Sequence, residues 1–136
     1  MPRIKIALGV LLAAVILFAA GWLSGASGRR AVESAGREAQ LRLHATEARA
    51  ALNAARVDIY ERNFGQASRS LEQAKGSLGR TAAALDEAGR AAEAASVREA
   101  LARSAKAQQL AGAVDQAANS EAAEALRLLE RSGAGR

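Results

Sequence analysis

The chain has 136 residues, and half of them are hydrophobic, but only four are aromatic and none is cysteine. The missing cysteines exclude disulfides, thiolate metal sites and cysteine nucleophiles from this sequence. The formal net charge of +5 comes from acids and bases that are interspersed, whereas nucleic-acid-binding surfaces usually gather basic residues into a stripe with stacking aromatics.

The amino-acid composition predicts an all-α fold. About a quarter of the residues are alanine, the best intrinsic helix former, and the single proline stands at position 2. Valine and isoleucine are sparse after residue 28 and do not alternate with polar residues as they do in strands.

Residues 6–28, IALGVLLAAVILFAAGWLSGASG, contain no charged side chain. A helix rises about 1.5 Å per residue, so this run would extend about 34 Å, enough to cross a hydrocarbon core of about 30 Å. Basic residues flank the run on both sides and an indole lies near one end, as is typical of membrane interfaces. The predicted interface residues are Arg3, Lys5, Trp22, Arg29 and Arg30. Residues 1–28 are therefore predicted to be a transmembrane anchor in contact with membrane lipid.

A cleaved secretory signal is the alternative for the same residues, because Ser24, Gly25 and Ala26 form a small-residue triplet of the kind that precedes cleavage. The apolar run is longer than the roughly 7–15 residues usual in a signal, which favours an uncleaved anchor. Basic residues on both sides leave the orientation open. The triplet and Trp22 favour a single-pass protein of the bacterial inner membrane whose C-terminal domain is exported to the periplasm.

Residues 29–132 are predicted to be an alanine-rich domain of antiparallel helical hairpins. Small and apolar residues recur at spacings of three and four, which places them on one face of each helix. The first run is Leu41, Ala45, Ala48, Leu52, Ala55 and Ile59. The second is Phe64, Ala67, Leu71, Ala74, Leu78, Thr81, Leu85 and Ala88. Because alanine buries little area, we expect the domain to depend on a partner, the membrane or self-association for full order.

The segment between these runs, RNFGQA, is predicted to be the turn of the first hairpin. Asn63 suits a turn, and Gly65 could adopt a positive φ if the turn requires one. Phe64 is expected to be the large apolar anchor of this turn, packed against the preceding helix near Tyr60.

The second hairpin is less regular in sequence. A break is expected near residues 89–95, because glycines interrupt the second run. The next apolar run is Val97, Leu101, Leu110, Val114 and Ala117. In the final helix the expected cap is Asn119 or Ser120, the expected apolar stripe is Leu126, Leu128 and Leu129, and the expected stop is Gly133. Residues 133–136 are expected to fray.

Residues 63–74, NFGQASRSLEQA, resemble the middle of a tetratricopeptide repeat, where an Asn-Tyr/Phe turn precedes a helix with small, large and small residues in that order. The matching positions are Asn63, Phe64, Ala67, Leu71 and Ala74. Residues 118–129 superpose on them at an offset of 55 residues, longer than the usual repeat of about 34, and alanines replace the large residue and glycine of its first helix. The resemblance implies a protein-interaction scaffold. The layout also resembles membrane-anchored stalks such as the b-type stator subunits of rotary ATP synthases, which implies a structural stalk.

Candidate binding residues are Arg42, Arg49 and Arg56, which recur every seven residues and share a helix face. They could line a groove for an acidic partner or for lipid headgroups, or form a solvated flank beside the apolar face. The single histidine, His44, has only Glu47 at helical spacing and is expected to be a surface residue, not a metal ligand.

The sequence shows no phosphate-binding glycine loop and no Ser-His-Asp set, so we expect no catalysis, metal or cofactor. The predicted function is that of a non-catalytic scaffold or accessory subunit that binds another membrane or periplasmic protein in a larger complex. The alternatives are a self-associating stalk or coiled coil, which would be a homo-oligomer, and a secreted helical domain if residues 1–28 are cleaved. Nucleic acid is not expected as a partner.

Overall fold

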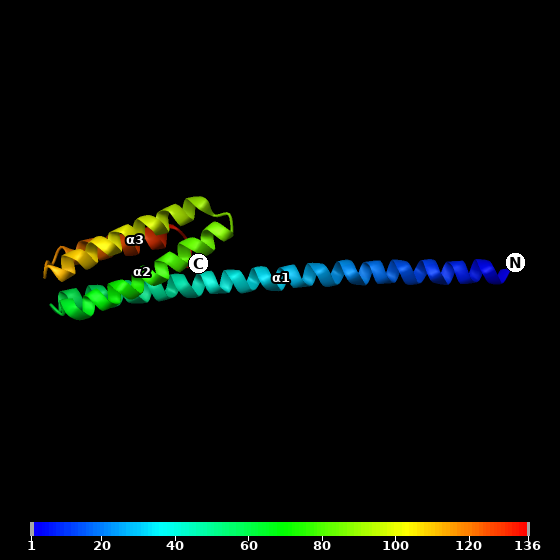
Figure 1. Ribbon diagram of the computed structural model, residues 1–136, viewed down its shortest axis with the longest axis horizontal. Helices are drawn as coiled ribbons and strands as arrows, with labels where there is room; N and C mark the ends of the chain where they lie inside the picture. The colour runs from blue at the N-terminus through cyan, green and yellow to red at the C-terminus, as the bar shows by residue number, and fades with distance from the viewer. Residues whose placement is uncertain (1, 136) are drawn as a thin grey trace. The chain divides into compact units, whose positions relative to one another are not determined.

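The computed structural model describes the backbone of residues 2–135 and the side-chain surroundings of residue 15 and residues 31–135. Over residues 2–135 it contains four helices and no strand (Figure 1), so the predicted all-α class is confirmed. The helices are α1 (Pro2–Tyr60), α2 (Phe64–Glu87), α3 (Ala91–Gly112) and α4 (Ala118–Arg131). The chain divides into two compact units, Met1–Arg37 and Glu38–Arg136.

The first unit holds the N-terminal part of α1. In the part of the chain whose side chains are described, no helix is both long and apolar enough to cross a bilayer. The predicted anchor, residues 1–28, lies outside that part except for Val15. The predicted interface residues also lie outside it; they are Arg3, Lys5, Trp22, Arg29 and Arg30.

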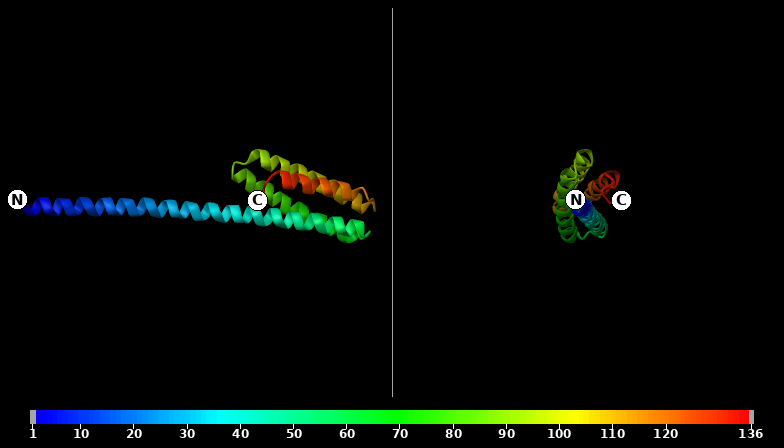
Figure 2. Two further views of the ribbon diagram at one scale, coloured as in Figure 1. Left: turned by 180° about the vertical axis from the view of Figure 1, so that it is seen from behind. Right: turned by 90° about the vertical axis from the view of Figure 1, so that its right-hand side faces the viewer.

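The second unit is a four-helix bundle formed by residues 38–60 of α1 together with α2, α3 and α4. Consecutive helices reverse direction at each turn (Figure 1), and α3 packs against both α2 and α4 (Figure 2). Side chains of α1 reach α2 where Asp58 accepts a hydrogen bond from Ser70, and α4 where Arg56 donates to Asn119. Each helix of the bundle therefore has two neighbours around one core.

Alanine and leucine fill this core. The first run is buried from Leu41 to Ile59, as its spacing predicts. The second run is buried from Ala67 to Leu85, whereas Ala88 is exposed because α2 ends at Glu87. Among the described residues, every buried side-chain nitrogen or oxygen has a hydrogen-bond partner. The described part of the core thus leaves no buried polar side chain without a partner.

The C-terminal ends of α1, α2 and α3 share one backbone arrangement, the Schellman motif, in which two backbone N–H groups reach back into the last turn. After α2, for example, Arg90 N donates to Leu85 O at 2.8 Å and Gly89 N donates to Asp86 O at 2.9 Å. The motif requires one residue in the left-handed region. This residue is Arg62 (φ 61°) after α1, Gly89 (φ 71°) after α2 and Val114 (φ 58°) after α3.

The first turn lies at residues 61–63, between α1 and α2. Asn63 is the N-cap of α2, and its side-chain oxygen accepts a hydrogen bond from Gln66 N at 3.4 Å. The turn does require a positive φ, but Arg62 adopts it and not Gly65, because Gly65 already lies inside α2. Phe64 is only partly buried against the core, and Tyr60 is 82% exposed. Phe64 is therefore a partial anchor of the turn.

The turn between α3 and α4 differs from the expectation at both ends. Val114 and Ala117 are exposed instead of buried, because α3 ends at Gly112. Neither Asn119 nor Ser120 caps α4, because this helix begins at Ala118. The N–H of Ala117 donates instead to Asp115 Oδ1 at 2.8 Å.

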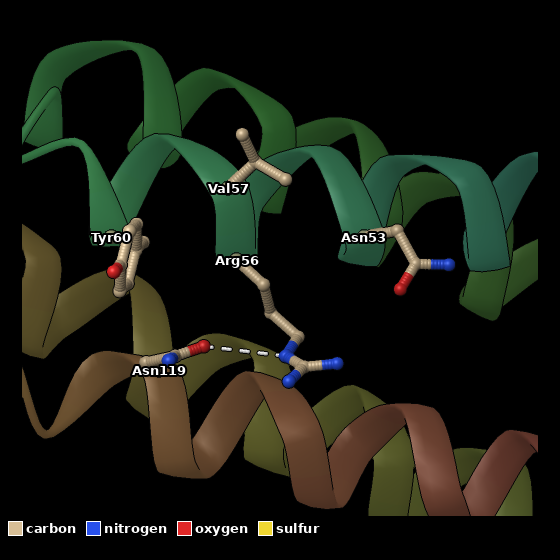
Figure 3. Close-up of a pocket in the computed structure, with 5 residues that line it drawn as sticks. All are labelled: Asn53, Arg56, Val57, Tyr60 and Asn119. Atoms are coloured by element: carbon tan, nitrogen blue, oxygen red, sulfur yellow. Dashed lines mark hydrogen bonds between the residues drawn. The ribbon is translucent and has the colours of Figure 1, made fainter.

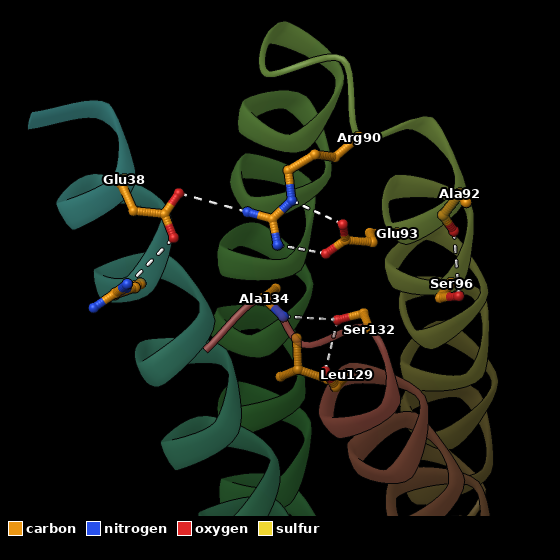
Figure 4. Close-up of polar contacts among 9 residues, drawn as sticks. Glu38, Arg90, Ala92, Glu93, Ser96, Leu129, Ser132 and Ala134 are labelled. Carbon is orange, nitrogen blue, oxygen red and sulfur yellow. Dashed lines mark hydrogen bonds and ion pairs between the residues drawn. The ribbon is translucent and has the colours of Figure 1, made fainter. Parts of the chain in front are cut away.

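The last helix and its tail pack onto the bundle. Leu126, Leu128 and Leu129 are buried, and Gly133 follows the helix with a φ of 71°, so both predictions are confirmed. The fraying of residues 133–136 stays a prediction. Ala134 is buried, and its N–H donates to Ser132 Oγ at 3.3 Å (Figure 4).

Candidate functional site

The face of α1 that points away from the bundle core carries a second row of uncharged residues, which we call the outer α1 stripe. Its members follow one another at spacings of four and three, and all are exposed. They are Ala39, Leu43, Thr46, Ala50, Asn53, Val57 and Tyr60. Three of them are large apolar residues with more than half of their surface in solvent: Leu43 at 55%, Val57 at 56% and Tyr60 at 82%.

The position of the stripe follows from helix geometry. Each residue turns the helix by about 100°, so a residue two positions after a core residue lies about 200° away, on the opposite face. Leu43 follows buried Leu41 in this way, and Val57 follows buried Ala55. Sequence reasoning misses the stripe because the first apolar run already accounts for one face of this helix. The sequence does contain a signal for the stripe: uncharged residues recur at spacings of three and four, each one or two positions from a residue of the first apolar run.

A pocket of about 310 Å³ lies at the C-terminal end of the stripe. Three residues of the stripe line it, together with one arginine and one residue of α4 (Figure 3). The lining residues are Asn53, Arg56, Val57, Tyr60 and Asn119. Arg56 Nε donates to Asn119 Oδ1 at 3.3 Å between two of these lining residues (Figure 3). The pocket therefore combines the side chains of Val57 and Tyr60 with two asparagines and one guanidinium group.

The three arginines predicted as binding residues flank the stripe on one side, but they have different surroundings. Arg42 is exposed and forms an ion pair with Glu38 at 3.4 Å. Arg49 is partly buried and lies against the backbone at Gly135. Arg56 is also partly buried and contacts α4 at Asn119. The geometry brings only Arg56 into the pocket.

A polar network on the opposite flank joins α1 to α2 and is centred on Glu47. Glu47 Oε2 accepts hydrogen bonds from Ser77 Oγ and from Arg80, each at 3.3 Å. His44 Nδ1 lies 3.4 Å from both Glu47 and Arg80, and it either donates to the first or accepts from the second. Hydrogen bonds from His44 and Arg80 hold the pKa of Glu47 below its ordinary value. His44 is thus a partly buried surface residue, as expected.

Arg90 ties the turn between α2 and α3 to α1 (Figure 4). Its guanidinium donates to both carboxylate oxygens of Glu93, at 2.8 and 2.5 Å, and lies 3.5 Å from Glu38 of α1. The paired hydrogen bonds raise the pKa of Arg90 and lower the pKa of Glu93. Glu38 also forms an ion pair with Arg42, so two arginines and two glutamates balance in this cluster, which joins the turn to α1.

Glu121 joins α4 to α3. Its carboxylate forms ion pairs with Lys106 at 2.5 Å and with Arg103 at 3.1 Å. Hydrogen bonds from these two residues, that from Lys106 being the stronger influence, lower the pKa of Glu121. The same contact raises the pKa of Arg103.

Among the described residues, no group of three or more histidine, cysteine, aspartate or glutamate side chains could hold a metal ion. The outer α1 stripe and its pocket are the candidate binding site, because they place exposed apolar side chains beside a guanidinium group. No protein-family model matches this chain, and comparisons with curated proteins and with solved structures find no match either.

Proposed function

We propose that this chain is a non-catalytic, membrane-anchored helical scaffold or accessory subunit that binds another protein through the outer α1 stripe. The observation that carries the proposal is the stripe itself. It is an uncharged surface with large apolar side chains in solvent, on a bundle that already has a buried core of its own. Exposed apolar patches of this kind mark interaction sites in soluble domains.

The charge-free run of residues 6–28, with basic residues on both sides and Trp22 near one end, supports the membrane anchor. A partner in the same membrane or in the periplasm fits this arrangement, if the C-terminal domain is exported. The resemblance of residues 63–74 to a tetratricopeptide repeat adds support for protein binding.

Two alternatives remain with the proposal. The chain would be a self-associating stalk if the stripe binds only other copies, and a secreted helical domain if residues 1–28 are removed. Recovery of the full chain from the membrane pellet after a carbonate wash supports the anchor. Mature protein that begins near Ser27 contradicts it.

Site-specific photocrosslinking tests the stripe directly. A photoreactive residue at Val57 of the full chain should yield a crosslinked adduct in cells, and Leu43→Glu in the same chain should abolish it. The matched control places the same residue at Ala102, which is exposed on α3. The mass of the adduct identifies the partner. Equal adduct yields from Val57 and Ala102 would contradict a binding role for the stripe.

A further inference from the structure

We infer that the outer α1 stripe is the interface of a parallel, in-register two-stranded coiled coil between two copies of this chain. This inference rests on the proposed function for the choice of surface, and it names a second copy of this chain as the occupant, which is the self-associating alternative given above. Four observations support it. The stripe repeats every seven residues, and all of its residues are exposed. Arginines lie on one side of it and glutamates on the other, and two of these charged side chains have no ion pair among the described residues.

The stripe has the seven-residue repeat of a coiled coil. Its spacing of four and three residues alternates without interruption from Ala39 to Tyr60, which is three heptads. In heptad notation the a positions are Leu43, Ala50 and Val57. The d positions are Ala39, Thr46, Asn53 and Tyr60. All seven are exposed in the single chain, so a second helix has access to the whole stripe.

The charges beside the stripe are arranged for pairing with a parallel copy. The g positions are Arg42, Arg49 and Arg56, and the e positions are Gln40, Glu47, Ala54 and Glu61. In a parallel coiled coil, a g residue faces the e residue five positions later on the other helix, so Arg42 would face Glu47 of the second copy. Arg56 would likewise face Glu61 of the second copy.

An antiparallel pair would be disfavoured by the same charges. That arrangement places g residues opposite g residues, which brings arginine against arginine on one flank and leaves glutamate near glutamate on the other. A pattern of only arginine among the charged g residues and only glutamate among the charged e residues therefore selects the parallel orientation. The three arginines are the ones that recur every seven residues in the sequence, and two of them gain a glutamate partner in this arrangement.

The pair formed by Arg56 and Glu61 is the one most available for a second copy. Neither side chain forms an ion pair within residues 31–135, and the hydrogen bond from Arg56 to Asn119 leaves its positive charge without a carboxylate partner there. Glu61 also follows the hydrogen-bond pattern of the helix, since its N–H donates to Val57 O at 2.9 Å. Arg42 and Glu47 have partners in their own chain, so they would contribute less.

A charge-swap experiment on the full chain in mild detergent tests the inference. Arg56→Glu alone and Glu61→Arg alone each place like charges opposite one another twice per dimer, so each should weaken self-association about tenfold. A mixture of the two variants restores both attractive pairs, as does the double variant, and both should associate like the parent. Arg69→Glu, an exposed charge reversal on α2, is the control and should have no effect. Sedimentation or subunit-exchange fluorescence measures each association constant.

Cysteine crosslinking tests the register. The chain has no cysteine, so a disulfide in Asn53→Cys reports two copies that meet at the same residue. It should form much faster than in Ala102→Cys. Any of three results would contradict the coiled coil. They are equal rates of disulfide formation in Asn53→Cys and Ala102→Cys, a parent chain that is monomeric, and single charge variants that associate like the parent. If the photoreactive residue at Val57 then still captures a different protein, the proposed function stands without the self-association.

Discussion

Arg56 of α1 donates a hydrogen bond to Asn119 of α4 at 3.3 Å, and this contact joins the first helix of the bundle to the last. The two residues are 63 positions apart in the chain. Asn119 is therefore a bridging residue and not the helix cap that its place in the sequence indicates.

Asn119→Ala should lower the free energy of unfolding by about 0.5–1 kcal/mol, because it removes one partly exposed hydrogen bond to a charged group. Chemical denaturation measures the change. Ser120→Ala is the control, since Ser120 was the other candidate cap and is exposed. A loss of stability in Ser120→Ala as large as in Asn119→Ala would contradict this assignment.

Val114→Gly should stabilise the protein by about 1 kcal/mol. Val114 holds a φ of 58° in a Schellman motif, a conformation that costs about 1–2 kcal/mol for a residue with a Cβ atom. Its side chain is 66% exposed, so little packing is lost on removal. A rise of several degrees in the thermal midpoint is expected for a domain of this size. The reverse change, Gly89→Val at the equivalent position after α2, should lower the midpoint. If Val114→Gly is destabilising, Val114 contributes a contact that outweighs its strain.

Phe64→Ala should cost about 1–2 kcal/mol, less than the roughly 3–5 kcal/mol of a fully buried phenylalanine, because Phe64 is only partly buried. Leu71→Ala, at a core position with no exposed surface, should cost about 2–5 kcal/mol. Denaturant titrations monitored by circular dichroism compare the two. A Phe64→Ala variant that unfolds like the parent would show that the turn between α1 and α2 needs no apolar anchor.

Acid should destabilise the bundle through its paired glutamates. Ion pairing with Lys106 and Arg103 lowers the pKa of Glu121 from its ordinary value of 4.5. A carboxyl with a lowered folded-state pKa stabilises the fold above its unfolded pKa, and this contribution is lost as the pH falls through the folded pKa. The thermal midpoint should therefore fall as the pH drops below about 4.5.

Glu121→Gln should make that acid dependence shallower and should lower the midpoint at neutral pH. Glu130→Gln, an exposed residue of the same helix, is the matched control. An unchanged pH dependence in Glu121→Gln would show that the ion pairs between α3 and α4 contribute nothing to stability.

The sequence alone determined the helical class, the inner face of α1 and the break after α2. These features depend on local causes: the alanine content, the spacing of apolar residues and the glycine at position 89. Gly133 likewise predicted the end of α4, because a left-handed residue ends a helix at the lowest cost when it is glycine.

Only the tertiary structure decided what the remaining patterns mean. Arg62 and Val114 adopt positive φ values that local preference disfavours, since the packing of the following helices determines where each turn must fall. α1 carries apolar residues on two opposite faces, and spacing cannot tell which one is buried. Leu41 and Leu43 differ in exposure because α2 and α4 pack against the face that carries Leu41, which leaves Leu43 in solvent and available to a partner.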